Sequence, residues 1–176
     1  MKLTNNLLIL PEKTSEIKKI LHNAAVDEKK ISKTIEITGI SKISTANNLS
    51  LTDFIFTGLS KIYNKYDSFF LNVDALIVVS QTYDDRIPSI STRVQSKFNL
   101  PSDIFCIDIM DGCAGYIKAL KVASLLESKG YKKIIIIAGE INSLMTSKSD
   151  VGTRILFGDG ISISIIEADD SSFDAI

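Results

Sequence analysis

Two aliphatic segments constrain the fold of this chain more than any other feature. Residues 73–79 (VDALIVV) form a nearly continuous apolar run, and residues 132–138 (KKIIIIA) form another. A strand with one face in water alternates apolar and polar residues, whereas the first run predicts a strand covered on both faces. Strands of that kind are typical of parallel sheets packed between helices, so the first run is expected inside an α/β domain.

Helical and extended patterns alternate along the rest of the chain. The sequence predicts strands at residues 7–10, 73–79, 104–109, 132–138 and 162–166, and helices beginning near Ser15, Ser50 and Ser89 and at residue 114. The polar segments 41–48, 80–86 and 142–152 are expected to be loops. This order predicts an α/β fold with a mostly parallel sheet that helices cover on both faces.

Composition and charge exclude several classes of protein. The chain has 176 residues, 45% hydrophobic and 23% charged, as expected for one globular domain with a sizeable core. Its formal net charge of −1 indicates neither a nucleic-acid partner nor an anionic membrane surface. The apolar run within Met1–Leu10 is too short for a secretory signal, and no segment is long enough to span a bilayer. Two cysteines at unlike positions predict neither a disulfide framework nor a metal site, so a cytoplasmic location is expected.

A reactive cysteine is predicted where a strand meets a helix. The strand at residues 104–109 leads into a short turn that ends at Cys113, and the helix at residues 114–128 follows. The first turn of a helix offers unpaired N–H groups and about half a positive charge, which favour the nucleophilic thiolate. Gly112 and Gly115 leave room for a substrate. The arrangement suits acyl transfer through a thioester, although a small buried hydrophobic residue would fit the spacing equally well.

The remaining candidates have simpler interpretations. Cys106 lies within the strand and is expected to pack there. His22 lies beside the apolar stripe of a helix, which favours a structural role. Lys29, Lys30 and Lys33 form a basic cluster that predicts a solvated face or, alternatively, a docking point for an acidic partner or a phosphate.

Three stretches together resemble a known family. Residues 74–80 followed by Pro88-Ser89, residues 108–120 with Cys-Ala-Gly-Tyr at 113–116, and residues 150–160 ending in Phe-Gly-Asp-Gly occur in the family's order and spacing. On these motifs, residues 36–166 resemble the N-terminal half of β-ketoacyl-acyl carrier protein synthase III, a condensing enzyme of the thiolase-like superfamily.

The resemblance implies an activity for Cys113. In the family the cysteine takes an acyl group from a CoA or carrier-protein thioester, and the carbanion from decarboxylated malonyl-carrier protein then attacks the acyl-enzyme. The backbone N–H of Cys113 would join an oxyanion hole. No cofactor is implied beyond these substrates: acyl-CoA or acyl-carrier protein, and malonyl-carrier protein.

The resemblance also implies substrate-binding residues. The floor of the site would be shaped by Phe157, Gly158, Asp159 and Gly160. Ile87 matches the position that limits the acyl pocket across the family's dimer interface. An aliphatic residue there, where an aromatic one is frequent, predicts an altered preference for acyl length.

Partners follow from the same resemblance. Acyl carrier protein and a homodimer formed through the strand at residues 104–109 are expected. The family's second half supplies a His and an Asn, so this chain is expected to need that half, in the same chain or as a second one; a non-catalytic subunit is the alternative. Residues 167–176, with four acidic groups and two serines, predict a linker or tail after a domain of residues 1–166.

Two further departures bear on chemistry. Lys33 and Ile37 stand where the family often has an aromatic residue and an arginine that grip CoA, so acyl-CoA, acyl-carrier protein and other thioesters all remain open as donors. Asp111, two residues before the cysteine, would act against the helix dipole, because a nearby carboxylate disfavours a thiolate.

Overall fold

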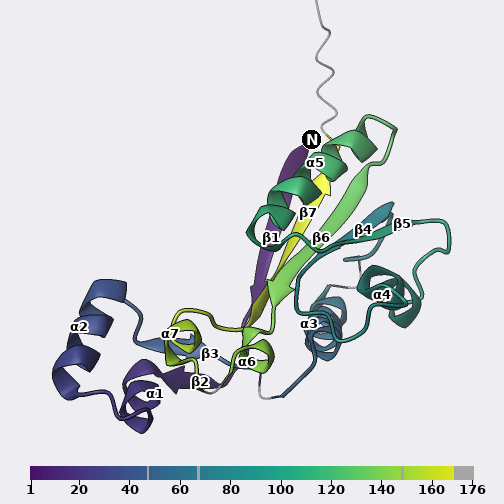
Figure 1. Cartoon of the computed structure of the whole chain (residues 1–176). Coiled ribbons are helices and arrows are strands. Elements are labelled where there is room, and N and C mark those ends of the chain that lie inside the picture. The colour runs from purple at the N-terminus through teal and green to yellow at the C-terminus, as the bar shows by residue number, and fades with distance from the viewer. Residues whose placement is uncertain (47, 67, 148, 169–176) are drawn as a thin grey trace, which may run out of the picture.

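The computed structural model describes residues 1–46, 48–66, 68–147 and 149–168. A main sheet of strand order β1-β7-β6-β4-β5 stands beside a smaller lobe built on the ribbon β2-β3 (Figure 1). The strands are β1 (Lys2–Ile9), β2 (Thr14–Glu16), β3 (Lys42–Ser44), β4 (Ala75–Val79), β5 (Phe105–Ile109), β6 (Lys133–Glu140) and β7 (Gly160–Glu167). The helices are α1 (Ile17–Asn23), α2 (Glu28–Thr38), α3 (Leu51–Lys65), α4 (Ile90–Lys97), the 3-10 turn η1 (Gly112–Ala114), α5 (Gly115–Glu127), α6 (Asn142–Met145) and α7 (Val151–Arg154).

Strand directions confirm the mostly parallel sheet. β4 runs parallel to both β5 and β6, whereas β7 runs antiparallel to β6 and β1. β1, β4, β5 and β6 therefore point the same way, and β7 points against them. The pairs Val79↔Ile109, Val79↔Ala138 and Glu140↔Gly160 bring the ends of β4, β5 and β6 and the start of β7 to one edge. We call this edge the carboxyl edge, and the edge where β4, β5 and β6 begin the amino edge.

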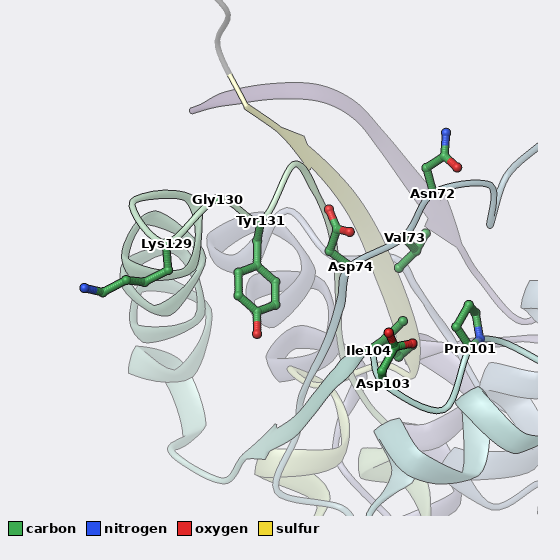
Figure 2. A pocket seen from close by; sticks show the side chains of 9 residues that line it. All are labelled: Asn72, Val73, Asp74, Pro101, Asp103, Ile104, Lys129, Gly130 and Tyr131. Atoms are coloured by element: carbon green, nitrogen blue, oxygen red, sulfur yellow. The ribbon is translucent and has the colours of Figure 1, made fainter.

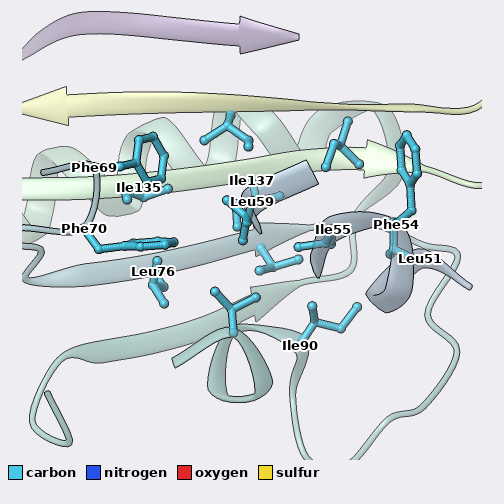
Figure 3. Close-up of a cluster of buried hydrophobic side chains, with 14 of the residues drawn as sticks. Leu51, Phe54, Ile55, Leu59, Phe69, Phe70, Leu76, Ile90, Ile135 and Ile137 are labelled. Carbon is cyan, nitrogen blue, oxygen red and sulfur yellow. The ribbon is translucent and has the colours of Figure 1, made fainter. Parts of the chain in front are cut away.

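Side chains alternate between two apolar layers across β4 and β6. Leu76, Ile135 and Ile137 face a layer made with α3 and α4, in which aliphatic side chains pack with the rings of Phe54, Phe69 and Phe70 (Figure 3). Ala75 and Ile77 face α5 on the other side. The central strand is buried along its whole length, so the prediction that both faces are covered is confirmed.

Small residues let α5 approach the sheet closely. Ala119 and Ala123 are fully buried against it. At Gly115, the first residue of α5, a Cβ would come within 2.5 Å of Val79 Cγ1. The start of the helix, and with it the turn that carries Cys113, is therefore held against the end of β4.

The cap predicted at Ser50 is confirmed, and Ser89 caps a second helix in the same way. The Ser50 hydroxyl accepts the Asp53 N–H at 3.1 Å at the start of α3, and the Ser89 hydroxyl accepts the Thr92 N–H at 3.3 Å at the start of α4. The predicted cap at Ser15 is wrong, because this residue pairs with Ile43 in the ribbon and α1 begins after Glu16.

The smaller lobe corrects two predicted loops. Segment 41–48 contains β3, and segment 142–152 contains α6 and the first two residues of α7, although Asn47 and Lys148 lie outside the described residues. Ile17, Leu21, Ile31 and Ile155 form the lobe's own apolar cluster. Three-residue strands and single-turn helices carry too little periodicity to be predicted from sequence.

The predicted tail falls mostly outside the described residues. Glu167 ends β7, where it pairs with Lys2 and Lys133, and residues 169–176 are not described. The domain boundary at residue 166 therefore stays a prediction. In the part of the chain that is described, no helix combines the length and apolar character needed to cross a membrane.

Candidate active site

Cys113 lies at the carboxyl edge, in η1 between the end of β5 and the start of α5, and its side chain is exposed. Gly112, with φ +48°, gives the left-handed backbone that turns the chain here. An exposed thiol on a turn at the front of a thirteen-residue helix fits a nucleophile and does not fit a buried packing residue. Its role as the nucleophile stays a prediction.

The negative charge that was expected to oppose the thiolate has a partner. Asp111 forms an ion pair with Lys118, one helical turn into α5. A cation beside the carboxylate offsets much of its field at the neighbouring thiol. The conflict that the sequence indicated between Asp111 and the helix dipole is therefore reduced in the fold.

A second carboxylate, Glu140 at the end of β6, organises the loop that follows β4. It accepts hydrogen bonds from Ser80 Oγ at 2.8 Å, Gln81 N at 3.0 Å, and Thr82 N and Oγ1 at 3.0 and 2.7 Å. Sequence reasoning missed this residue. The available signal was a charged side chain directly after an aliphatic strand, at the end where a parallel sheet places its sites.

Asp159, predicted to shape the floor of the site, has a buried carboxylate that joins three segments. It accepts the N–H groups of Ala46 at 2.7 Å and Ser143 at 2.8 Å, and the Ser143 hydroxyl at 2.5 Å. Its own N–H donates to the carbonyl of Ser44 at 2.9 Å. The side chain therefore fixes the shape of this edge through its hydrogen bonds.

The other predicted floor residues surround this anchor. Phe157 is half exposed. Gly158 lies against Ser44, whose carbonyl oxygen would stand 3.2 Å from an added Cβ, and Gly160 opens β7. Three strand spacings separate β7 from β5, roughly 14 Å. The fold thus brings Cys113 and the Gly-Asp-Gly bend to the same edge of one sheet.

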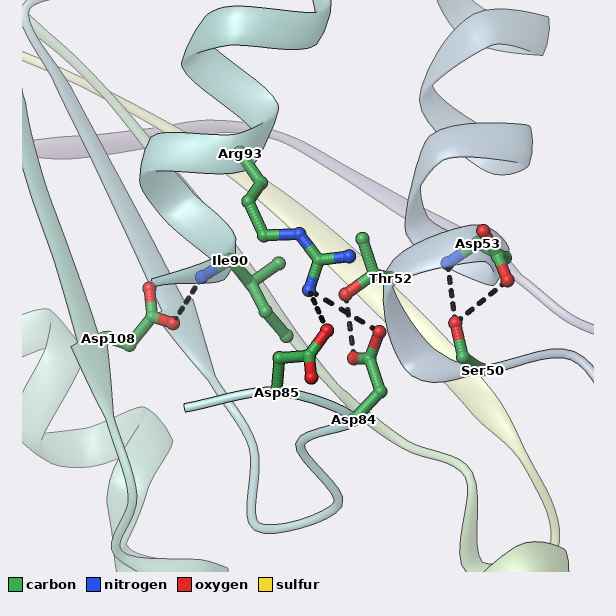
Figure 4. Close-up of polar contacts among 8 residues, drawn as sticks. All are labelled: Ser50, Thr52, Asp53, Asp84, Asp85, Ile90, Arg93 and Asp108. Carbon is green, nitrogen blue, oxygen red and sulfur yellow. Dashed lines mark hydrogen bonds and ion pairs between the residues drawn. The ribbon is translucent and has the colours of Figure 1, made fainter. Parts of the chain in front are cut away.

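Ile87 projects from the loop between β4 and α4 and is 88% exposed. That loop is well anchored (Figure 4): Arg93 pairs with Asp84 at 3.4 Å, Thr52 Oγ1 donates to Asp84 at 2.6 Å, and Asp108 accepts the Ile90 N–H at 2.7 Å. A large apolar side chain held in water on an anchored loop fits contact with another polypeptide. Its predicted place across a dimer interface stays a prediction.

The structure gives Cys106, His22 and the lysines of α2 no place in the candidate site. Cys106 is half buried in β5 and packs against the apolar core, as expected, and burial with the nearby Asp108 carboxylate raises the pKa of its thiol. His22 is exposed in the last turn of α1 in the smaller lobe. Lys29 and Lys33 are exposed on α2, which fits the solvated face.

The hollow in Figure 2, of about 460 Å³, lies at the amino edge and belongs to a different part of the molecule. Asp74, Asp103, Lys129 and Tyr131 line it. The Asp74 carboxylate is already bound to the N–H groups of Lys132 and Lys133, at 2.6 and 2.9 Å. Among the described residues, no three His, Cys, Asp or Glu side chains gather closely enough to hold a metal ion.

A cysteine exposed between an edge strand and a helix on one face of a layered sheet fits the thiolase-like class that the sequence motifs predicted. The family described as 3-oxoacyl-[acyl-carrier-protein (ACP)] synthase III matches residues 107–176. The chain is thus related, through part of its length, to β-ketoacyl-acyl carrier protein synthase III, as the sequence motifs predicted.

Individual relatives agree. A β-ketoacyl-[acyl-carrier-protein] synthase III of Acholeplasma laidlawii is 33% identical over 141 residues, which are 78% of this chain and 45% of that protein. The synthase III 2 of Bacillus cereus is 35% identical over 102 residues, 57% of this chain and 31% of that protein. The chain therefore spans less than half the length of these relatives.

Solved structures support the fold. The 3-oxoacyl-(acyl-carrier protein) synthase from Burkholderia xenovorans LB400 superimposes with a TM-score of 0.84 at 24% identity, covering 96% of this chain and 48% of that one. The synthase III from Aquifex aeolicus VF5 gives a TM-score of 0.81 at 22% identity, covering 96% and 54%. The thiolase-like fold predicted from sequence is confirmed.

Proposed function

We propose that this chain carries the acyl-accepting half of a condensing enzyme, with Cys113 as the residue that is acylated. The observation that carries the proposal is the exposed thiol on the turn before α5, in a chain related to synthases of type III. The predicted floor residues at the same edge support it, because a bound acyl donor needs surface beside the thiol.

The chemistry begins with attack of the Cys113 thiolate on the carbonyl carbon of an acyl thioester. The new C–S bond forms as the donor's C–S bond breaks, and the donor leaves as a thiolate that takes up a proton. Backbone N–H groups of the turn, that of Cys113 among them, would stabilise the oxyanion in between. Malonyl-carrier protein then loses CO₂, its carbanion attacks the acyl carbon, and the Cys113 thiolate is released.

A specific observation also favours the alternative, a partial subunit that acts with a second half. The chain has one histidine, His22, and it lies on α1 in the smaller lobe, so a His that promotes decarboxylation has to come from elsewhere. Ile117 and Leu125 project into solvent on the same side of α5, opposite its buried alanines. A second half that supplies the histidine could cover this side.

The expected partners follow from this proposal. Acyl carrier protein would deliver substrates in the cytoplasm. A second copy of the chain could pair through β5, which is the last strand in the sheet order and so has one free edge within the described sheet.

Intact-protein mass spectrometry tests the acylation step. The chain incubated with acyl-CoA or with acyl-carrier protein should gain the mass of one acyl group, Cys113→Ala should gain none, and the matched control Cys106→Ala should behave like the unchanged chain. No adduct with either donor, or an adduct that persists in Cys113→Ala, would overturn the proposal.

Release of labelled CO₂ from malonyl-carrier protein separates the complete enzyme from the partial subunit. The acylated chain alone should release none, because its own residues supply no histidine at the site. Release by the chain alone would contradict the dependence on a second half while leaving acylation of Cys113 intact.

A further inference from the structure

The Glu140 carboxylate accepts hydrogen bonds in addition to those that join β4 and β6 in the sheet. β4 and β6 are already joined by a parallel ladder that runs to Val79↔Ala138. The Glu140 carboxylate reaches beyond that ladder and binds donors on three consecutive residues, Ser80, Gln81 and Thr82. Bonds to an ionised acceptor are about twice as strong as neutral ones, so this loop segment is held in one conformation.

The bound segment in turn touches the turn that carries the thiol. Ser80 N–H donates to the carbonyl of Ile109, the last residue of β5, at 3.3 Å. Gln81 lies over Gly112, the residue before Cys113: a Cβ added to Gly112 would stand 3.3 Å from Gln81 Oε1. Both ends of the link from β5 to Cys113 therefore lie against residues that Glu140 fixes.

Apart from Ser80 and Gln81, the turn is supported by the ion pair of Asp111 with Lys118 and by the packing of Gly115 on Val79. It is short, Gly112 adopts a left-handed backbone conformation with φ +48°, and Cys113 is exposed. Where a nucleophile sits on such a turn, its position relative to a bound carbonyl depends on neighbouring segments. A misplacement of about 1 Å costs up to about a hundredfold in rate.

We propose that Glu140 is a positioning residue for Cys113, acting through Ser80 and Gln81 on the turn at residues 110–113. The inference rests on the proposed acylation of Cys113 for its catalytic meaning. Its structural part, that the carboxylate of β6 orders the nucleophile turn of β5 across the intervening β4, stands on the hydrogen bonds of Glu140 and Ser80 and on the close approach of Gln81 to Gly112.

The matched comparison is Glu140→Gln against Asp74→Asn. Each change removes the charge of a carboxylate that binds backbone N–H groups of a neighbouring segment, one at the carboxyl edge and one at the amino edge. A general loss of stability would affect both variants, whereas a positioning effect on Cys113 belongs to the first. Gln81→Ala, at an exposed side chain, tests the same route without risk to folding.

Two measurements are made in a Cys106→Ser background. Hydrogen exchange of the peptide spanning residues 110–116 should be at least about fivefold faster in Glu140→Gln and unchanged in Asp74→Asn. The rate of acyl transfer to Cys113 should fall about tenfold in Glu140→Gln, while alkylation by iodoacetamide at alkaline pH stays within about twofold. Gln81→Ala should reproduce part of the loss, and adding it to Glu140→Gln should cost little more.

The outcomes separate the two proposals. If the unchanged chain takes no acyl group, the proposed function fails, and hydrogen exchange still decides whether Glu140 orders the turn. If acylation occurs but exchange and acyl transfer in Glu140→Gln match those of Asp74→Asn, the positioning role is overturned. If Gln81→Ala is without effect or adds fully to Glu140→Gln, the route through Gln81 is wrong.

Discussion

At both edges of the main sheet, carboxylates accept backbone N–H groups, but these contacts support different surfaces. At the amino edge, Asp74 accepts the N–H groups of Lys132 and Lys133 and closes the short connection into β6. At the carboxyl edge, Asp108 accepts N–H groups from the first turn of α4, Glu140 from the segment after β4, and Asp159 from the segment after β3. A carboxylate bound to N–H groups is thus a general way in which this chain joins loops to strands.

What differs is the surface that the contact supports. At the carboxyl edge, the side chains of Cys113, Ile87 and Phe157 are exposed, although the loops that bear them are anchored. The amino edge surrounds an open hollow that contains no thiol. The carboxylates that anchor the loops of the carboxyl edge hold reactive and apolar side chains at fixed positions in water. A surface that binds a substrate or a partner requires such fixed positions.

The largest effect is expected from crowding at the carboxyl edge, at Gly139 in β6. An added Cβ there would collide with the carbonyl oxygen of Gly160 and stand 2.6 Å from Ile161 Cα, and backbone atoms cannot move aside. Gly139→Ala should lower the free energy of unfolding by about 3 kcal/mol in urea titrations.

The amino edge provides the control for this change. Gly130 has φ +94° and open space around its missing Cβ, so Gly130→Ala should cost only about 1 kcal/mol, from backbone strain. Equal losses in the two variants would contradict the view that close packing of β6 on β7 limits the carboxyl edge.

A smaller effect is expected when the anchors themselves are compared. Asp159→Asn places an amide N–H₂ among three donors in a buried position and should cost about 2 kcal/mol. Asp74→Asn, at a less buried position with two donors, should cost about 1 kcal/mol. Denaturation midpoints measure both, and a larger loss at Asp74 would show that the edges are anchored in the reverse order.

Loss of the anchor of the loop that bears Ile87 should change the free energy of unfolding least and the local order of the loop most. Arg93 pairs with Asp84 and Asp85 at 3.4 and 3.5 Å near the surface, so Arg93→Ala should cost less than about 1 kcal/mol. Trypsin cleavage after Arg86 should nevertheless become faster, because the loop loses its ties to α4. Lys97→Ala, on the same helix, should leave the cleavage rate unchanged; equal acceleration in both variants would contradict the role given to Arg93.

The sequence predicted those parts of this comparison that depend on local pattern. β4 was recognisable from its apolar run, and Ser50 was recognisable as a cap, because each signal lies within a few residues. The motif around Cys113 placed the thiol between β5 and α5 correctly. These features need no knowledge of which segments meet in space.

The anchors of the carboxyl edge could not be predicted in this way. Asp159 binds Ala46, 113 residues earlier, and Glu140 binds Thr82, 58 residues earlier. The ribbon pair Thr14↔Ser44 joins strands too short to show a period. Such contacts depend on the sheet order, in which β6 lies beside β4 although β5 intervenes in the chain.

Tyr83 offers a test of the charge that these anchors create. Burial, with the Asp108 and Glu140 carboxylates adding to it, raises the pKa of Tyr83 well above its usual range. The folded protein therefore keeps this phenol protonated at a pH where the unfolded chain, with a phenol pKa near 10, has released the proton. Because the unfolded state then binds fewer protons, stability is fully present below about pH 10 and declines as the pH rises above it.

Urea titrations between pH 8 and 11 should show this decline, and Tyr83→Phe should make it less steep while changing little at pH 8. Tyr66→Phe is the control, because its ring is exposed and the variant should follow the unchanged chain. Removing one of the two charges, in Glu140→Gln, should lower the pKa of Tyr83 in the folded state, so the decline should level off at a lower pH while its onset stays the same. This difference should vanish when Tyr83→Phe is present, and a difference that persists in the double variant would assign the alkaline sensitivity of the carboxyl edge to another group.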